Sequence, residues 1–590
     1  MKKTLALILA AAMLFALLTA CGSGGKPAGT APPEQTAAAP TAGPPTASDT
    51  ETAAPTEGPE EEESLYNYAA GKYEVGADGY PTSTYEYELP LTTSDEVLTF
   101  WTVVFMPQFI PEDGYEELPN IAETKKMTGV NVEYIVLGPE VRGENMAIML
   151  AADELPDMMS QALYYTGMGY KQNIEDGYLL NLYDYREYMP NYMYYANSMG
   201  DDNVKTTVMP EEGWMYAVYA MYDESLVTMG YLAREDWLEK LGMTNTDINT
   251  LDDVHEMLTL FKTQIDGCRW PMEMISSVDV VCFFSCFDTI TQVNGTGLPT
   301  GYIVDGKVVM PHSGENDYNY ASTLAQWNKE GLIDPGWTGY YMAMSFENYV
   351  SAGTTGFVFM QPMNVITHET AAPDPDTRWE PVHNPYLREG QTLHFAYQDT
   401  YLNYGHTCLS AKCSNIELAL TWCDWRYSTQ GSFFSSYGVQ GLTWDYNDAG
   451  EPELTEFSLN NENGIDFGNL CNIYMANFLA EHGMEIYQRK YAFKGGERFR
   501  GMHDVWADVN TDKAYQWPSA VTFTADQESE LAGYSGDIVT FIAENFLAFL
   551  SGNKPMTEWN AYVGTLNSLG WDEVRRIKQE AYDAFIAANG

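Results

Sequence analysis

The run EVLTFWTVVF at residues 96–105 is rich in β-branched and aromatic side chains, which is the composition of a buried strand. A helix-like segment from Ile121 to Met127 follows and ends at Gly129, and VNVEYIVLG at 130–138 is a second strand-like run. A strand, a helix and another strand at this spacing predict a parallel sheet covered by helices. The fold class that we expect is therefore α/β.

Helical segments with one apolar face recur along the rest of the chain. Thr250 precedes LDDVHEMLTLFKTQ as an expected N-cap, with Asp253 in the position that completes a capping box. Helical spacing of apolar residues also predicts helices at 537–550 and 572–586. About 500 residues remain after the amino-terminal segments described next, more than one hydrophobic core supports, so we expect two or more lobes.

The first 20 residues have the pattern of an export signal. A basic start, Met1-Lys2-Lys3, precedes an apolar run from Leu5 to Leu18. This run is shorter than the about 20 apolar residues that a membrane-spanning helix needs. Leu18-Thr19-Ala20-Cys21 resembles the lipobox of bacterial lipoproteins, which implies cleavage before Cys21 and diacylation of its thiol. We expect a lipid anchor on the extracellular face of the cell membrane; the alternative is an ordinary secretory signal with an incidental cysteine.

Residues 21–63 have the composition of a tether. Apart from the expected lipidated Cys21, they are mostly Gly, Pro, Ala, Thr and Glu, with almost nothing to bury. Such a composition does not offset the entropy cost of ordering, so we expect a disordered linker. Residues 64–95 are a mixed lead-in segment before the first predicted strand.

Charge and aromatic content narrow the class of partner. The net charge is −53, with 83 acidic residues against 30 Lys and Arg, which argues against nucleic acid because a phosphate backbone needs cations. The chain also holds 42 Tyr, 24 Phe and 14 Trp. Aromatic rings offer flat apolar faces, and Tyr and Trp add a polar group, which suits the C–H faces and hydroxyls of sugars. The alternative is that most of these rings belong to the core.

Catalytic motifs are not evident in the sequence. There is no His-Glu-x-x-His, Gly-x-Ser-x-Gly or Gly-x-Gly-x-x-Gly. GYIVDGKV at 301–308 has P-loop spacing but places Val308 where a Ser or Thr is required, and we interpret it as a turn at Asp305-Gly306. Seven of the eight cysteines remain after Cys21, and their spacing matches no standard zinc pattern.

One segment carries oxygen ligands of the kind that calcium takes. NTDINTLDD places Asn245, Asp247, Asn249 and Asp253 close together, but it lacks the glycine and the terminal Glu of an EF-hand loop. The favoured interpretation is a polar loop that enters a capped helix. No cofactor is expected, and calcium remains an alternative.

Seven segments, in order along the chain, resemble landmarks of one family. They are ADELPDMMS (152–160), IEDGYLLNLYDYREYMPNY (174–192), YLAREDWLEKLGM (231–243), LAQWNKEGLIDP (324–335), LSAKCSNIELALTWCDWRYSTQG (409–431), YGVQG (437–441) and the carboxyl-terminal stretch from TADQESELAGYSGDI to LGWDEVRRIKQEAYDAF. The chain resembles the extracellular solute-binding lipoproteins of ABC importers, carbohydrate type (family 1), in the large form common among Gram-positive bacteria. One departure is Gln440, where the family commonly has a Glu.

This resemblance implies two α/β lobes of the periplasmic-binding-protein type, joined by a hinge. The first lobe would comprise 96–213 plus 395–445 and the second 214–394 plus 446–590, with crossovers near 214–222 and 394–402. The implied function is capture of a carbohydrate, an oligosaccharide above all, between the lobes and its delivery to an ABC permease. The protein would be a monomer and not an enzyme. An anchored glycoside-active enzyme, whose acids would come from distant positions, and a binding subunit for a sensor or peptide importer remain alternatives.

A sugar receptor needs aromatic floors and convergent hydrogen bonds in a cleft, and no nucleophile. Aromatic residues in turns or at strand ends are the candidate platforms: Trp214, Trp270, Trp337, Tyr340 and Trp444. The candidate polar partners are Gln108, Asp157 and Asp445.

Overall fold

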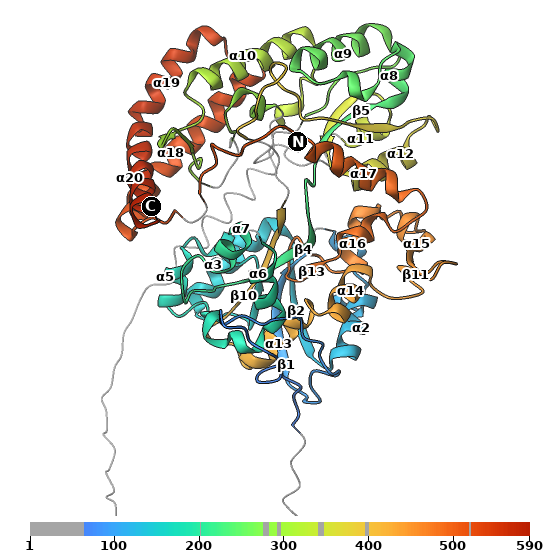
Figure 1. Cartoon of the computed structure of the whole chain (residues 1–590), viewed down its shortest axis with the longest axis vertical. Coiled ribbons are helices and arrows are strands. Elements are labelled where there is room, and N and C mark those ends of the chain that lie inside the picture. The colour runs from blue at the N-terminus through green and yellow to red at the C-terminus, as the bar shows by residue number, and fades with distance from the viewer. Residues whose placement is uncertain are drawn as a thin grey trace, which may run out of the picture. The chain divides into compact units, whose positions relative to one another are not determined.

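The computed structural model (Figure 1) describes residues 64–104, 106–200, 202–274, 283–291, 297–339, 347–395, 400–518 and 521–589. The expected signal peptide at 1–20, Cys21 and the expected linker up to residue 63 lie outside these residues, as does Tyr340. Within the described ranges, no helix combines the length and the apolar character that a membrane crossing requires.

A six-stranded mixed sheet forms the first structural layer, in the order β13-β4-β10-β3-β1-β2. Its strands are β1 (Val97–Val103), β2 (Asn131–Leu137), β3 (Met158–Ser160), β4 (Val218–Leu226), β10 (Thr400–Leu409) and β13 (Met484–Glu485). The strands β1, β2 and β3 are parallel to one another, whereas β10 runs antiparallel to both β3 and β4. The strand, helix and strand predicted from 96 to 138 are confirmed, with α2 (Pro119–Thr128) as the helix.

A glycine ends α2 for two physical reasons. Gly129 adopts φ 71°, the left-handed conformation that closes a helix, and its N–H bonds to the carbonyl of Lys125. A Cβ at this position would also lie 2.1 Å from the carbonyl oxygen of Thr92. The chain therefore turns tightly at Gly129 and enters β2 beside β1.

Helices cover the faces of the six-stranded sheet (Figure 1). They include α3 (Arg142–Ala152), α4 (Leu163–Thr166), α5 (Tyr170–Glu175), α6 (Pro190–Ser198), α7 (Asp202–Val208), α13 (Ile416–Trp425) and α14 (Thr429–Tyr437). The core between these layers is aromatic, with Phe100, Trp101, Tyr192, Trp422 and Tyr427 all fully buried.

The lead-in segment 64–95 is part of this packed body. Tyr87 donates a 2.8 Å hydrogen bond from its hydroxyl to Asp424 Oδ2, and the Asp424 carboxylate also accepts from the backbone N–H groups of Asn191 and Tyr192. Burial raises the pKa of Asp424 to about 7. One buried carboxyl group thus joins the lead-in segment, α6 and α13.

A second, three-stranded antiparallel sheet has the order β8-β5-β9. Its strands are β5 (Gly230–Arg234), β8 (Phe357–Met360) and β9 (Trp379–Val382). The helices that share its hydrophobic core are α8 (Glu235–Leu241), α9 (Leu251–Gln264), α10 (Glu315–Glu330), α18 (Ala525–Leu550), α19 (Trp559–Ser568) and α20 (Trp571–Asn589). The predicted helices at 537–550 and 572–586 are confirmed within α18 and α20, and the capping box of Thr250 and Asp253 is present at the start of α9.

The stretch with P-loop spacing is a hairpin, as interpreted. It forms β6 (Tyr302–Val304) and β7 (Lys307–Val309) on either side of Asp305-Gly306. Six of the cysteines lie in the described part of the chain, and each is a free thiol: Cys268, Cys286, Cys408, Cys413, Cys423 and Cys471.

The helix α17 (Gly496–Ala507) packs against the segment that leaves β4 and enters β5. The Trp506 indole donates a 3.1 Å hydrogen bond to the carbonyl of Tyr231, and His503 Nδ1 lies 2.7 Å from the carbonyl oxygen of Val227. A Cβ at Gly230 would lie 2.3 Å from the Trp506 ring. This contact explains why the position has no side chain.

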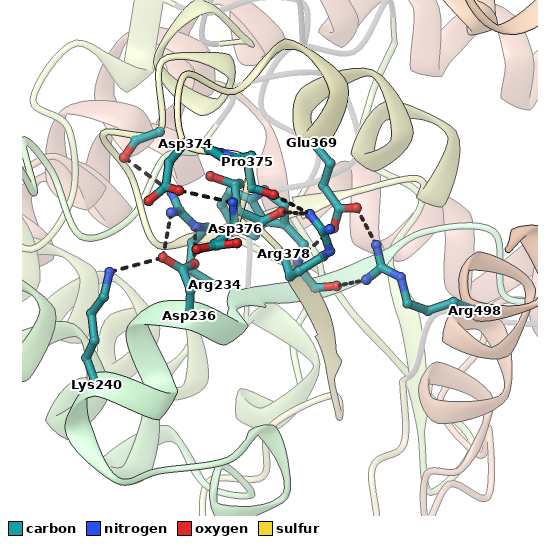
Figure 2. Close-up of polar contacts among 12 residues, drawn as sticks. Arg234, Asp236, Lys240, Glu369, Asp374, Pro375, Asp376, Arg378 and Arg498 are labelled. Carbon is teal, nitrogen blue, oxygen red and sulfur yellow. Dashed lines mark hydrogen bonds and ion pairs between the residues drawn. The ribbon is translucent and has the colours of Figure 1, made fainter.

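Charged groups fix α17 to the three-stranded sheet (Figure 2). Arg498 pairs with Glu369 of α12 (Pro362–Ala371) and donates a 2.9 Å hydrogen bond to the carbonyl of Trp379 at the start of β9. At the end of β5, buried Arg234 binds both carboxylate oxygens of Asp236, at 2.7 and 2.9 Å. Bidentate pairs of this kind add geometric specificity, so the junction of β5 and α8 is held in one arrangement.

Each sheet has a large hydrophobic core of its own, and a further cluster joins Tyr222 and Leu226 of β4 to Leu232, Val358 and Trp379 of the three-stranded sheet. Residues 64–590 form one compact unit. The segment between β4 and β5 links the two sheets, and β10 pairs with β4 beside that link. The lobe boundaries given above stay a prediction.

Candidate ligand-binding surface at the carboxyl ends of the parallel strands

The carboxyl ends of β1, β2 and β3 share one edge of the six-stranded sheet because these strands are parallel. In open α/β sheets, ligands bind outside the carboxyl ends of the strands. The antiparallel strand β10 pairs Thr407 with Ser160, the last residue of β3, so its earlier residues continue past that edge. The residues that follow β1 and β3, together with the start of β10, therefore form the candidate ligand-binding region.

Gln161, directly after β3, is held in an unusual backbone conformation. Its φ is 53°, in the left-handed region that a residue with a Cβ rarely adopts. Its N–H donates a 2.8 Å hydrogen bond to the carbonyl of His406, and its Nε2 donates a 2.7 Å bond to the carbonyl of Leu479. Strained residues that the surroundings hold in place concentrate at functional sites.

Arg142, at the start of α3, holds the side chain of Gln161 through a hydrogen bond. Its Nη1 donates a 3.0 Å hydrogen bond to Gln161 Oε1, and its Nη2 donates to the carbonyl of Ser160. The guanidinium lies 4.0 Å from the centroid of the Trp101 ring and 4.6 Å from that of Tyr165. Burial lowers the pKa of Arg142 to about 10, so the group remains protonated at neutral pH.

Two tyrosine rings and a leucine are exposed beside Gln161. Tyr164 is 61% exposed, Tyr404 is 49% exposed with φ 61°, and Leu479 is 50% exposed. The N–H of Tyr164 donates a 3.2 Å hydrogen bond to the carbonyl of Gln161, and His406, whose ring meets that of Tyr164, lies 3.2 Å through its Nδ1 from the carbonyl oxygen of Tyr404. We call Gln161, Tyr164, Tyr404 and Leu479 the carboxyl-end surface.

A row of packed rings leads away from this surface. The Tyr164 ring meets His406 edge-on at 5.1 Å, and His406 contacts Tyr219 at 5.2 Å. The row continues through Tyr216, whose ring stacks on Tyr170 at 4.7 Å, to Trp214, which meets Tyr170 at 6.2 Å. Burial lowers the pKa of His406 to about 4, so this imidazole is neutral at physiological pH. The row makes a rigid support for the exposed rings.

Of the residues proposed from sequence, Gln108 follows the carboxyl end of β1, and Trp214 is reached only through the ring row. Gln108 is exposed in the short 3₁₀ turn Pro107–Phe109, which follows the carboxyl end of β1. Trp214 is half-buried at the far end of the ring row, where Lys171 lies 5.7 Å from its ring centroid. Their roles as ligand contacts stay predictions.

The structure corrects the proposal for Asp157 and Trp337. Asp157 is buried at the amino end of β3, where it accepts hydrogen bonds from the N–H and hydroxyl of Thr99 and from the N–H of Ser414. These bonds lower the pKa of its carboxyl group although burial opposes them. Trp337 is fully buried in the core of the second sheet and bonds Asn328 Oδ1 at 3.1 Å. Neither side chain presents a face to a ligand.

The remaining candidates lie elsewhere. Trp270 is half-buried next to Gly331 and the Lys262 side chain, at the ends of α9 and α10. Tyr340 lies outside the described residues, and Trp444 and Asp445 belong to β11 (Trp444–Tyr446).

The prediction from sequence missed Gln161, Tyr164 and Tyr404. The carboxyl-end rule applied to SQALYY at 160–165 would have pointed to the first two.

The calcium candidates are engaged in capping. Asp247 Oδ2 accepts from the N–H of Thr244 at 2.8 Å, and Asp253 Oδ2 accepts from the N–H groups of Asn249 and Thr250 at 3.1 and 2.7 Å. The Asn245 amide donates to the carbonyl of Pro381. Across the described ranges, no cluster of three or more His, Cys, Asp or Glu side chains is placed to hold a metal ion.

No family model and no curated protein matches the chain by sequence. Solved structures do match its fold. The alginate-binding protein AlgQ2 without calcium ion is 19% identical, with 83% of this chain and 99% of that chain covered and a TM-score of 0.65. An HMO-binding solute-binding protein associated with an ABC transporter, from Bifidobacterium longum infantis, is 17% identical over 83% and 99%, with a TM-score of 0.64. The S. pneumoniae ABC-transporter substrate-binding protein FusA in complex with kestose is 18% identical over 84% and 100%, with a TM-score of 0.62. The chain has the α/β fold of solute-binding proteins.

Proposed function

We propose that this protein is an extracellular, membrane-anchored receptor that captures an oligosaccharide at the carboxyl-end surface and delivers it to an ABC permease. The observation that carries the proposal is a pair of exposed rings, Tyr164 and Tyr404, together with the strained Gln161 in the region that follows the carboxyl ends of the parallel strands. Receptors of this kind bind and release their ligand without changing a covalent bond.

The chemistry of the surface suits a sugar. Phenol rings provide apolar faces for pyranose or furanose C–H groups, and their hydroxyls remain available for hydrogen bonds. Gln161 and exposed Gln108 are amides that can donate to and accept from hydroxyl groups. Arg142 is buried and donates a hydrogen bond to Gln161 Oε1, which orients the amide. Its charge therefore acts on a ligand only through Gln161.

The solved neighbours support the class of ligand. Their printed names speak of alginate, HMO and kestose, which are chemically different glycans held by one fold. The fold therefore supports a carbohydrate receptor, and the side chains at the carboxyl-end surface select the glycan. All three are described as binding proteins, which favours a protein without catalytic activity here.

A panel of pure oligosaccharides tests the proposal. A ligand that binds only the native state raises the melting temperature by mass action. We expect at least one of nystose, maltohexaose, mannohexaose, xylohexaose and lacto-N-tetraose to do so, and the Tyr164→Ala/Tyr404→Ala variant to lose that shift. Tyr318→Ala, an exposed ring in α10, is the matched control and should keep it. New reducing ends after incubation would point to an anchored glycoside-active enzyme and contradict the proposal.

The lipid anchor is tested separately. We expect Cys21→Ser to appear in the culture medium, while the unaltered chain stays with the membrane fraction. Cys268→Ser, which alters a half-buried thiol in the folded part, is the control and should leave the distribution unchanged. Equal retention of the Cys21→Ser protein on the membrane would refute acylation at this residue.

A further inference from the structure

A groove of about 990 Å³ lies away from the carboxyl-end surface. It is formed by the last turns of α2, by α14 and by β11 (Trp444–Tyr446), which pairs with β12 (Pro452–Leu454) in a hairpin. Its lining includes Phe433, Trp444, Tyr446, Gln430 and Gln440, with Glu86, Glu123 and Lys126 as the charged members.

The topology places this groove at the opposite edge of the sheet. The helix α2 starts beyond the carboxyl end of β1 and runs back to Thr128, after which Gly129 leads into the first residue of β2. Lys126 and Met127, in the last turn of α2, line the groove and therefore lie near the amino ends of the parallel strands. A ligand in this groove would not occupy the carboxyl-end surface.

Tyr446 is the exposed ring of the groove, at 58% exposure. It meets the Trp444 ring at 5.2 Å and 83°, and Trp444 in turn meets Phe433 at 5.0 Å and 84°. The Trp444 indole is anchored by a 3.2 Å hydrogen bond to the carbonyl of Gly438. Asn447 Oδ1 accepts from the N–H groups of Ala449 and Glu451, which fixes the turn of the hairpin. The ring is thus displayed on a rigid support.

Each charged member of the groove has a hydrogen-bond partner within the chain, and Lys126 and Glu123 form an ion pair. Glu86 accepts from the N–H of Thr429 at 2.6 Å, and Lys126 binds both carboxylate oxygens of Glu123, at 2.9 and 3.0 Å. With Glu86 and Glu123 against Lys126, the groove lining has one more acidic than basic group. The excess carboxylate disfavours an acidic ligand, and because all three groups already have partners within the chain, the lining favours an uncharged ligand.

The polar members are amides. Gln440 Nε2 donates a 3.1 Å hydrogen bond to Asp445 Oδ1, which fixes the orientation of the amide and leaves its Oε1 to accept from a ligand. Gln430, at the start of α14, lines the same groove. An exposed ring, the oriented amide of Gln440 and charged groups that already have partners suit a neutral sugar, whose faces are apolar and whose edges carry hydroxyls.

We infer that this groove is a second carbohydrate-binding surface, which takes a neutral oligosaccharide of about two or three rings, given that pockets of 300–1,000 Å³ hold ligands of this size. The inference goes beyond the proposed function because it assigns a ligand to the other edge of the sheet. A long glycan could bind both surfaces of one protein at once. Once it is bound to one surface, its effective concentration at the other is high, so that release from one surface leaves the glycan bound to the other.

The test measures the resonance of a labelled Trp444 side chain in the full chain. The protein is labelled with 5-fluorotryptophan, and the resonance of Trp444 among the 14 tryptophans is assigned with Trp444→Phe. The probes are nystose, maltohexaose, mannohexaose, xylohexaose and lacto-N-tetraose, each titrated to about 10 mM so that weak single sites saturate. We expect at least one probe to shift the resonance saturably, and Tyr446→Ala to raise its dissociation constant about tenfold or more. Tyr318→Ala is the matched control and should leave that constant unchanged.

A second variant distinguishes a failure of this inference from a failure of the proposed function. In the Tyr164→Ala/Tyr404→Ala variant we expect the Trp444 shift to persist, whether or not the carboxyl-end surface proves to bind sugar. Loss of the shift in that variant would mean that Trp444 reports the other surface, and would overturn the inference. So would a Trp444 resonance that no probe moves, or one that moves with protein concentration alone, because a second copy of the chain would then cover the groove.

Discussion

Arg142 Nη1 donates a 3.0 Å hydrogen bond to Gln161 Oε1, which links a buried cation to a residue with positive φ directly after the carboxyl end of β3. The same guanidinium also bonds the carbonyl of Ser160 and lies over the Trp101 ring. Trp101 in turn donates a 2.8 Å bond from its indole to Asn145. The orientation of Gln161 therefore depends on groups that do not themselves reach a ligand.

Replacement of Arg142 by Met should lower both stability and affinity. Hydrogen bonds from a charged donor contribute about 1.5–3 kcal/mol each, and a buried cation over an aromatic ring about 2 kcal/mol, while a Met stem recovers part of this by packing. We expect a loss of about 3 kcal/mol in the free energy of unfolding, measured by urea titration, and weaker oligosaccharide binding by calorimetry. Arg576→Met, which removes a guanidinium from surface ion pairs, is the control and should change neither much. Unchanged affinity of Arg142→Met would exclude a positioning role.

Gln161→Gly should separate stability from binding. A non-glycine residue at φ 53° costs about 1 kcal/mol of backbone strain, which glycine does not incur. The variant loses the bonds to Leu479 and Arg142, so the net change in stability should be small. Affinity should fall because the amide is gone. Gln161→Asn, which tolerates the left-handed region and keeps an amide, should bind better than Gln161→Gly; equal affinities would contradict the role given to the amide.

The parts of this fold that depend on local sequence could be predicted, and those that depend on pairing between distant segments could not. The β1–α2–β2 unit and the capping box at Thr250 are short-range patterns, and both were correct. Tyr164 and Tyr404 come together because β3 pairs with β10 from far along the chain, which single-sequence periodicity does not reveal. Trp337 and Tyr446 look alike in sequence, as aromatic residues near turns, yet one is fully buried and the other is exposed.

Glu273 should make the protein less stable as the pH rises. Its side chain is buried, and burial together with the nearby Asp334 raises the pKa of its carboxyl group from 4.5 to about 9. Between these values the folded state retains a proton that the unfolded state has released, so each rise in pH favours unfolding, by at most about 1.4 kcal/mol per pH unit. We expect Glu273→Gln to be more stable than the unaltered chain at pH 8 and to show a shallower decline between pH 5 and 8 in urea titrations.

The control for this pH dependence is Glu389→Gln, which alters an exposed carboxylate. It should follow the profile of the unaltered chain. Arg269 opposes the rise in the pKa of Glu273, whereas Asp334 reinforces it. If Glu273→Gln and the unaltered chain decline in parallel, the proton is not held at Glu273 in the folded state.

Gly230→Ala should destabilise the link between the two sheets. The added Cβ would lie 2.3 Å from the Trp506 ring, far inside normal contact, so the indole has to move and its 3.1 Å bond to the carbonyl of Tyr231 is lost. Overpacking of this kind costs about 1–3 kcal/mol. Gly533→Ala is the matched control: this glycine is exposed in α18 with open space around it, and the change should add about 0.5–1 kcal/mol through helix propensity.

A double variant shows whether the contact with Trp506 is the cause. Trp506→Leu alone should be destabilising because it removes a large buried ring. Once the ring is absent, the methyl group at position 230 has room, so the cost of Gly230→Ala in the Trp506→Leu background should fall towards zero. Urea titrations of the four proteins measure this coupling. Equal costs of Gly230→Ala in both backgrounds would mean that the Trp506 ring does not require a glycine at position 230.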